Sequence, residues 1–318
     1  RLMYPNNSNP TRIAILDFGT NTFNLLIADV STENKLQVLH TSKEAVKLGE
    51  GGITKKIITE KAFNRGLSAI EKHLERVREF GVKKVYAFAT SAIRDASNGR
   101  EFTHAVQEKF DIYVLIIPGE REAEMIYRGV RLSLEMDEHP ALILDIGGGS
   151  NEFIIANKKE IFWKHSFNLG MARLLETFPP TDPISPKQIN ELKSYLKSEL
   201  KELFLAVAEY KPTVLIGASG SFETISAILH HRKPGEYSPV KTSSHEIKIK
   251  DFFELHEVLL KSTLEERKVM QGMEPVRVEM IVLASIFIFV TLKECDIQKI
   301  IQSDYALKEG VIAEILNL

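Results

Sequence analysis

The sequence has one cysteine, no long apolar run and almost no net charge. The lone Cys295 excludes a disulfide framework and a zinc site built from thiolates. Because no signal peptide is recognisable, we expect the protein in the reducing cytoplasm. The longest apolar run, Met280 to Leu292, has 13 residues, fewer than the ~20 that span a bilayer. We therefore predict a buried helix over this run and no membrane attachment.

The small net charge of −2 argues against general nucleic-acid binding, which needs a basic face. It still permits a local basic channel for a polyanionic substrate. With 44% apolar and 26% charged residues, the composition is that of a soluble globular protein. A length of 318 residues suits two domains, each large enough to bury its own core.

One stretch, residues 141–156 (ALILDIGGGSNEFIIA), organises the second half of the chain. Its apolar–turn–apolar pattern predicts a β-hairpin whose turn has almost no side chains, so that backbone N–H groups can approach an anion. The donors would come from Gly147, Gly148, Gly149 and Ser150. Asp145 and Glu152 flank the turn, where carboxylates can hold a hard cation that offsets phosphate charge.

The same pattern occurs in residues 15–28, which align with the first stretch without a gap at a constant offset of 128. Asp17 then corresponds to Asp145, and Thr22 to Ser150. The match suggests an internal duplication with two half-sites that face each other across a cleft. The alternative is a pair of ordinary glycine turns in a duplicated core. The phosphate-binding residues predicted in this half are Asp17, Gly19, Thr20, Asn21 and Thr22.

The order of the expected elements predicts an α/β protein, because strands and helices alternate around the two hairpins. Apolar spacing predicts helices over 59–80 and 120–134, and a long helix over 186–208. A last strand, 299–303, and a helix, 307–316, cannot bury their apolar faces alone, so we expect them to pack on the first domain. The predicted domains are residues 11–134 with 299–318, and residues 135–298.

Phosphoryl transfer also needs a group that orients or deprotonates the nucleophile. Residues 118–124 hold three candidate bases, Glu120, Glu122 and Glu124, at the start of a helix. Carboxylates in a first helical turn are common simply because they interact well with the helix dipole. The residue pattern therefore leaves the choice of base open.

Arg94 follows a strand at its carboxyl end, where ligand sites of α/β sheets concentrate. Its guanidinium is suited to a bidentate contact with phosphate. The alternative role is a surface salt bridge to Asp95 or Glu101. The nine histidines show no metal-ligand spacing, and no Ser-His-Asp or Cys-His arrangement can be argued.

Taken together, these motifs resemble the exopolyphosphatase/guanosine pentaphosphate phosphohydrolase (Ppx/GppA phosphatase) family, within the superfamily of actin, heat-shock and sugar-kinase ATPases. The resemblance extends along most of the chain. The matching stretches are 17–22 (DFGTNT), 47–51 (KLGEG), 89–98 (ATSAIRDASN), 117–123 (IPGEREA) and 144–152 (LDIGGGSNE), with weaker matches at 217–221 (GASGS) and 303–310 (SDYALKEG).

The resemblance implies two actin-like (ribonuclease H-like) domains with mixed sheets flanked by helices, and an active site in the cleft between them. It implies Mg²⁺-dependent release of terminal phosphate from polyphosphate, or of the 5′-γ-phosphate from guanosine pentaphosphate, a nucleotide of the stringent response. It assigns the catalytic base to Glu122, the metal to Asp145 and Glu152, and phosphate binding to Arg94. It also implies a homodimer.

The chain departs from the family pattern at four positions that bear on the site. Arg121 replaces the first glutamate of the Gly-x-Glu-Glu-Ala motif and places a cation beside the base. Asn24 stands where relatives often carry Arg or His, Lys308 where they carry Arg, and Ser221 where they usually carry Thr. Two other functions stay open: an ATP-dependent small-molecule kinase, and a non-catalytic sensor of guanosine tetra- or pentaphosphate.

Overall fold

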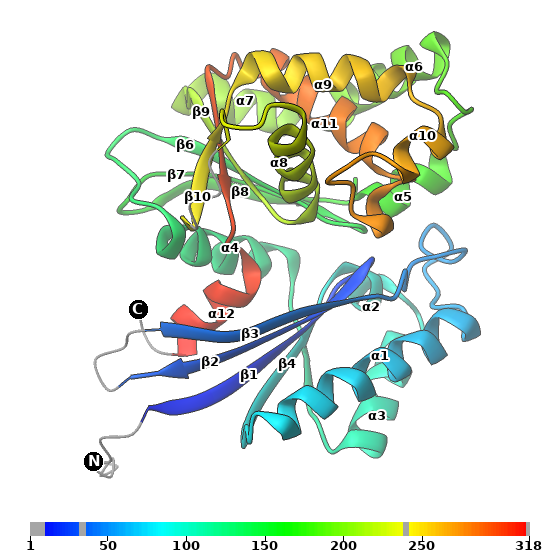
Figure 1. Ribbon diagram of the computed structural model, residues 1–318, viewed down its shortest axis with the longest axis vertical. Helices are drawn as coiled ribbons and strands as arrows, with labels where there is room; N and C mark the ends of the chain where they lie inside the picture. Colours follow the sequence, from blue (N-terminus) through cyan, green and yellow to red (C-terminus); the bar gives the residue numbers. More distant parts are fainter. Residues whose placement is uncertain (1–9, 32–35, 238–241, 316–318) are drawn as a thin grey trace. The chain divides into compact units, whose positions relative to one another are not determined.

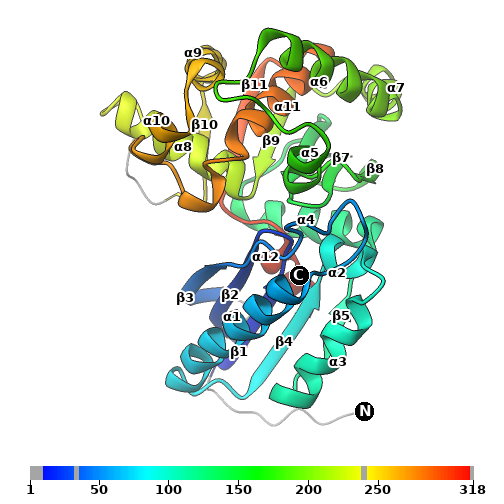
Figure 2. The ribbon, with the colours of Figure 1, turned by 90° about the vertical axis from the view of Figure 1, so that its right-hand side faces the viewer.

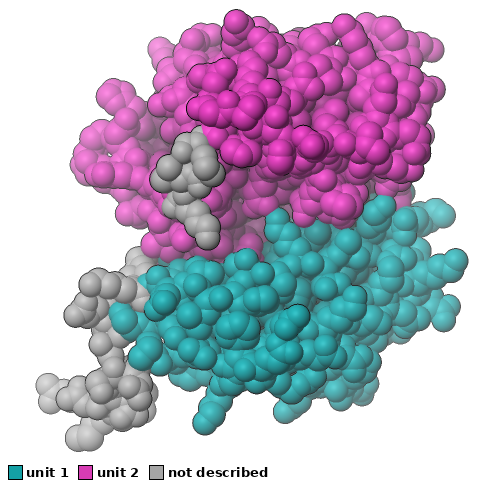
Figure 3. All heavy atoms as spheres, in the orientation of Figure 1, with its two compact units in different colours: residues 1–117, 312–318 teal, residues 118–311 magenta. Residues whose placement is uncertain are grey.

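The computed structural model describes residues 10–31, 36–237 and 242–315. The chain forms two compact units, coloured separately in Figure 3. Unit 1 comprises residues 1–117 and 312–318, and unit 2 comprises residues 118–311. Each unit has one mixed β-sheet flanked by helices, which confirms the predicted α/β class with two domains of mixed sheets flanked by helices.

The sheet of unit 1 has five strands in the order β3-β2-β1-β4-β5 (Figure 1). The first three strands pair antiparallel, and β4 and β5 continue from β1 in parallel. The strands are β1 Thr11–Phe18, β2 Thr22–Val30, β3 Leu36–Ala45, β4 Lys84–Ala89 and β5 Val114–Ile116. The first predicted hairpin is confirmed: β1 and β2 pair directly, and Asp17 lies opposite Asn24.

Among the described residues, three helices lie wholly in unit 1: α1 Glu60–Glu79, α2 Ser91–Asp95 and α3 Gly99–Phe110. The predicted helix 59–80 is confirmed by α1. Thr59 caps its start by accepting a hydrogen bond from the N–H of Ala62. Figure 2 shows α1 and α3 beside the sheet. Their apolar faces meet Leu16, Leu25 and other sheet residues in one core that also contains Phe102.

The sheet of unit 2 has six strands in the order β10-β11-β9-β6-β7-β8. These are β6 Ala141–Ile146, β7 Asn151–Ala156, β8 Ile161–Phe167, β9 Val214–Ala218, β10 Ser244–Ile247 and β11 Lys299–Ser303. β6, β7 and β8 pair antiparallel, and β6 pairs in parallel with β9. Because β1, β2, β3 and β4 repeat this pattern in unit 1, the two sheets support the predicted duplication.

The remaining helices are α4 Gly119–Ser133, α5 Met171–Thr177, α6 Pro186–Glu199, α7 Lys201–Tyr210, α8 Gly220–Arg232, α9 Ile249–Lys261, α10 Leu264–Lys268, α11 Ile281–Glu294 and α12 Leu307–Ile315. A short 3₁₀ turn spans Pro275–Arg277. The prediction of a single helix over 186–208 is wrong in one respect. The helix breaks at Leu200, whose backbone (φ −91°, ψ 16°) leaves the helical region between α6 and α7.

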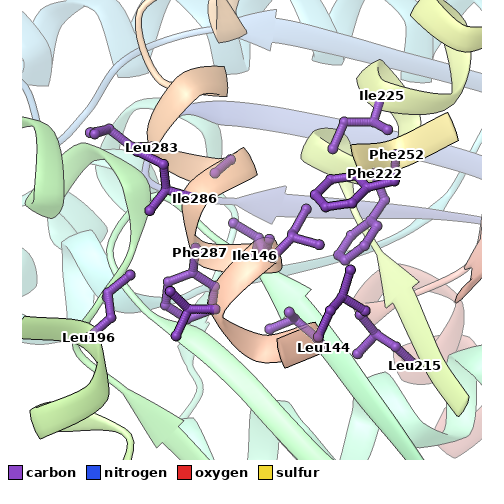
Figure 4. Packing of buried hydrophobic residues seen from close by; sticks show 14 of the residues in the cluster. Leu144, Ile146, Leu196, Leu215, Phe222, Ile225, Phe252, Leu283, Ile286 and Phe287 are labelled. Atoms are coloured by element: carbon purple, nitrogen blue, oxygen red, sulfur yellow. The ribbon is translucent and has the colours of Figure 1, made fainter. Parts of the chain in front are cut away.

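The apolar run of the sequence forms α11, which is buried on nearly all sides, as predicted. Figure 4 shows Leu283, Ile286 and Phe287 of this helix packed among residues of the sheet and of neighbouring helices. Within the described part of the chain, no helix combines the length and the apolar character needed to cross a bilayer.

The prediction that strand 299–303 packs on the first domain is wrong. β11 lies between β9 and β10 in the second sheet, and its buried Ile300 belongs to the core of unit 2. α4 also belongs to unit 2, where it packs on β7 and β8. α4 and α12 approach so closely that a Cβ at Gly310 would lie 1.7 Å from the carbonyl oxygen of Met125.

Candidate active site

The glycine turn of unit 2 is held by the connection between β8 and α5. The N–H of Gly170 donates to the carbonyl of Gly149 at 3.2 Å. A Cβ at Gly170 would lie 2.3 Å from the carbonyl carbon of Gly148, so only glycine fits here. Asn151 completes the arrangement, because it accepts from the N–H of Gly147 and donates to the carbonyl of Leu169.

The first N–H groups of α5 bind carbonyls of the same turn. Met171 donates to the carbonyl of Gly147 at 2.9 Å, and Ala172 to that of Gly148 at 2.8 Å. In a trans peptide the N–H points opposite to the carbonyl. The three N–H groups of Gly148, Gly149 and Ser150 therefore point away from α5, because the carbonyls before them point towards it. Successive N–H groups on one side form an anion-binding nest.

Asp145 and Glu152 lie directly opposite each other in the β6–β7 ladder, next to this turn. Side chains in such a pair have Cβ atoms about 5 Å apart. Both are buried, and Glu152 accepts a hydrogen bond from the hydroxyl of Ser166 at 2.6 Å. Burial raises the pKa of Asp145, against the lowering effect of a hydrogen bond from Ser219 and of the charges on Lys308 and Arg277.

The start of α8 approaches Asp145 in a strained conformation. Ser219 has φ 72°, in the left-handed region that favours glycine, and its side chain hydrogen-bonds Asp145. The next residue, Gly220, lies against Arg277: a Cβ there would be 2.1 Å from the Nη2 atom of that guanidinium. Strained residues of this kind concentrate at functional sites. The weak 217–221 motif is therefore part of the surroundings of Asp145.

The structure distinguishes the three glutamates of α4. Glu120 faces Lys164 on β8 at 3.4 Å, and its side chain is 54% exposed. Glu124 pairs with Lys164 at 3.4 Å and with Arg121, and these partners lower its pKa although burial opposes the shift. Glu122 is only 6% exposed. Of the three, Glu122 is the carboxylate shielded from water, while Arg121 forms its ion pair with Glu124.

The turn of unit 1 repeats the hydrogen bond of the turn in unit 2. The N–H of Gly19 donates to the carbonyl of Thr22, and that of Gly147 to the carbonyl of Ser150, both at 3.1 Å. The segment after β3 takes the place of α5. Leu48 donates to the carbonyl of Thr20, and Val46 and Lys47 donate to that of Asn21. The N–H groups of Asn21 and Thr22 consequently point away from this segment.

Asp17 and Arg94 are both engaged within unit 1. Asp17 accepts a hydrogen bond from the amide of Asn24 at 3.1 Å. Arg94 donates to the carbonyl of Ile117 at 2.9 Å and lies 3.6 Å from the carboxylate of Asp95. The salt bridge that the sequence offered as the alternative role of Arg94 is thus present. Phosphate binding by Arg94 stays a prediction.

A metal ion would have to rely on few protein ligands. Within residues 10–31, 36–237 and 242–315, no group of three or more His, Cys, Asp and Glu side chains is arranged to hold an ion. Mg²⁺ needs no such cage, because it commonly binds one or two carboxylates together with water and substrate phosphates. The paired and buried Asp145 and Glu152 fit this kind of donor set.

Sequence reasoning found the turns and their flanking carboxylates, but it missed four residues that position them. These are Asn151, Gly170, Ser219 and Arg277. Gly170 and Ser219 stand at the starts of helices, where a glycine and a strained serine give only a weak local signal. The sequence offers no signal for Arg277, which reaches the site from the turn before α11.

Known proteins resemble this chain along most of its length. A structure described as an exopolyphosphatase from Cytophaga hutchinsonii is 39% identical, with a TM-score of 0.93, over 96% of this chain and 98% of that one. A putative exopolyphosphatase of Haemophilus influenzae is 27% identical over 96% of this chain and 91% of its own length. A bifunctional 3-dehydroquinate synthase/phosphatase of Fusobacterium nucleatum is 29% identical over 86% of this chain, which spans only 42% of that relative. The Ppx/GppA phosphatase family model matches residues 26–318, and the chain belongs to that family.

Proposed function

We propose that the protein hydrolyses phosphoanhydride bonds and releases the terminal phosphate of inorganic polyphosphate, of guanosine pentaphosphate, or of both. The observation that carries this proposal is the nest at Gly148, Gly149 and Ser150, next to the carboxylate pair of Asp145 and Glu152. Donors fixed before the substrate arrives stabilise the charge of a transferred phosphoryl group without further reorganisation.

In this proposal the buried Glu122 is the general base. It orients a water molecule and takes its proton as the water attacks the terminal phosphorus, while the bond to the bridging oxygen breaks and the shortened chain leaves. The turn residues Gly19 to Thr22 and the guanidinium of Arg94 bind further phosphate oxygens. Asp145 and Glu152 would hold Mg²⁺, which offsets the charge of the phosphates when it is bound.

The decisive experiment measures phosphate release from long-chain polyphosphate and from guanosine pentaphosphate, side by side, with Mg²⁺. Glu122→Gln keeps the size of the side chain and removes the base, so we expect a loss of ~10²–10⁴ in kcat with substrate binding largely retained. Glu120→Gln is the matched control on the same helix and should retain most activity. Wild-type turnover by Glu122→Gln, or an equal loss in Glu120→Gln, would reject the assignment of the base.

Two other functions make different predictions in the same assay. A sensor binds guanosine tetra- or pentaphosphate tightly and releases no phosphate. A kinase transfers phosphate from ATP to a small acceptor and needs that acceptor for turnover. The retained Glu122, Asp145 and Glu152 favour hydrolysis over a sensor. The cytoplasmic location and the homodimer stay predictions, and sedimentation analysis tests the latter.

A further inference from the structure

The backbone of Ser219, between β9 and α8, has a conformation that local energetics do not explain. Its φ of 72° and ψ of −179° lie in a region that is essentially limited to glycine. Two other residues with positive φ, Asp111 (φ 56°, ψ 39°) and Lys211 (φ 51°, ψ 50°), lie instead in the ordinary left-handed helical region. The strain at Ser219 must therefore be offset by contacts of the folded chain.

Ser219 also fails to cap the helix that it precedes. Serine is a preferred residue at a helix start, because its hydroxyl can accept from a backbone N–H of the first turn. Ser185 and Thr263 do this for α6 and α10. The carbonyl of Ser219 accepts from the N–H of Glu223 at 3.2 Å, but its side chain caps none of the described N–H groups of α8. Its hydroxyl bonds the carboxylate of Asp145 instead.

The chain on either side holds Ser219 in this conformation. The preceding residue, Ala218, lies directly opposite Asp145 in the parallel β6–β9 ladder. The following residue, Gly220, is packed against Arg277, and a Cβ there would lie 2.1 Å from the Nη2 atom of the guanidinium. Because both neighbours are fixed, the backbone carries Ser219 past the carboxylate at the one place where the hydroxyl can reach it.

The other carboxylate of the pair has a similar support without strain. Ser166 lies opposite Glu152 in the β7–β8 ladder and donates to it at 2.6 Å. A carboxylate that accepts one hydroxyl keeps further lone pairs for a metal ion. Hydrogen bonds to a metal ligand fix its orientation, and their loss weakens metal binding by about 10-fold to 100-fold. A serine on each side can thus set the geometry of the carboxylate pair.

We propose that Ser219 is a positioning residue whose hydroxyl orients Asp145 towards Mg²⁺, and that its strained backbone is maintained for this contact. The inference rests on the proposed metal-binding role of Asp145 and Glu152. It explains why a serine occupies a position that glycine would fill without strain. It also explains why this serine does not cap its helix.

The test compares Ser219→Ala with Ser219→Gly, since both remove the hydroxyl but only alanine keeps the strain. Mn²⁺ binding to the metal-free protein, followed by electron paramagnetic resonance and by displacement with Mg²⁺, should be about 10-fold to 100-fold weaker in both variants. Without metal, Ser219→Gly should unfold at a temperature at least about 2–4 °C above that of Ser219→Ala. Metal affinity and stability should therefore change independently at this position.

Ser185→Ala is the matched control, because it removes a serine that does cap its helix, in the same unit. It should lower the unfolding temperature and leave Mn²⁺ affinity at the wild-type level. Wild-type affinity in both Ser219 variants would overturn the proposal, as would an equal loss in the control or a wild type that binds no Mn²⁺. If Ser219→Gly alone kept full affinity, backbone shape and not the hydroxyl would control the site. Equal unfolding temperatures of the two Ser219 variants would refute the role of strain.

Phosphate release from polyphosphate, measured on the same proteins, separates this proposal from the proposed hydrolysis. If Mn²⁺ affinity depends on the hydroxyl of Ser219 but the wild type releases no phosphate, the positioning role stands and hydrolysis fails. If phosphate is released and Mn²⁺ affinity is indifferent to Ser219, hydrolysis stands and the positioning role fails.

Discussion

Gly170→Ala tests whether the β8–α5 connection sets the geometry of the phosphate-binding turn. The added Cβ would lie 2.3 Å from the carbonyl carbon of Gly148 and from the nitrogen of Gly149, whereas ordinary contacts begin at 3.4 Å. Both neighbours are backbone atoms, so no side chain can rotate away. The turn must move by roughly 1 Å, a displacement that typically costs about 100-fold in rate.

The free energy of unfolding should fall as well, but not far enough for unfolding to explain the loss of activity. Overpacking of this kind costs about 1–3 kcal/mol, which leaves a domain of this size folded at 25 °C. We therefore expect a folded protein whose kcat/KM for polyphosphate is ~10²-fold lower. Steady-state kinetics and calorimetric unfolding on the same sample measure both effects.

Leu196→Ala is the control for destabilisation alone. Leu196 is fully buried in the core of unit 2, on α6, and its truncation should cost about 2–5 kcal/mol without moving the turn. Its kcat/KM at 25 °C should therefore stay near the wild-type value. If Gly170→Ala keeps wild-type kcat/KM, or if Leu196→Ala loses as much, the turn does not depend on this contact as we infer.

Three further substitutions test separate contacts. Burial lowers the pKa of His256 from 6.5 to about 4, so its contribution to stability is complete above pH 6.5 and falls by up to ~3 kcal/mol as the pH drops towards 4. His256→Phe should flatten this part of the curve of unfolding free energy against pH. Asn98→Ala removes two hydrogen bonds of 2.9 Å to the backbone of Ile58 and should lower the urea unfolding free energy by about 1–3 kcal/mol, with Thr103→Ala as a milder control. Asn151→Ala unties the turn from the β8–α5 connection and should raise KM for polyphosphate in initial-rate assays; an unchanged KM would show that the backbone hydrogen bonds of Gly170, Met171 and Ala172 are enough to hold the turn.

The sequence predicted the parts of the fold that depend on neighbouring residues. The two hairpins follow from glycine turns between apolar runs, and the bounds of α1 follow from the cap at Thr59 and the glycine at position 81. The position of β11 could not be predicted in this way. Its partner β9 lies more than 80 residues earlier in the chain, and parallel pairing over such a separation leaves no local pattern.

The same distinction between neighbouring and distant residues applies to the candidate site. Asp145 and Glu152 were predictable because they flank one turn in the sequence. Ser219 and Arg277 were not, because they reach Asp145 from other elements of the fold. The residue pattern alone also left the choice among the three glutamates of α4 open, because burial and ion-pair partners distinguish them only in the folded chain; the family resemblance singled out Glu122.

The contacts between α5 and the glycine turn have a consequence for natural variation. They run from backbone N–H groups to backbone carbonyls, so the identity of residues 171 and 172 does not enter them. A saturation library should therefore show sharp intolerance at Gly147 and Gly170, while position 172 accepts many residues. Selection for anion binding would then conserve a few glycines, whereas the other residues of α5 would vary within the limits that core packing sets.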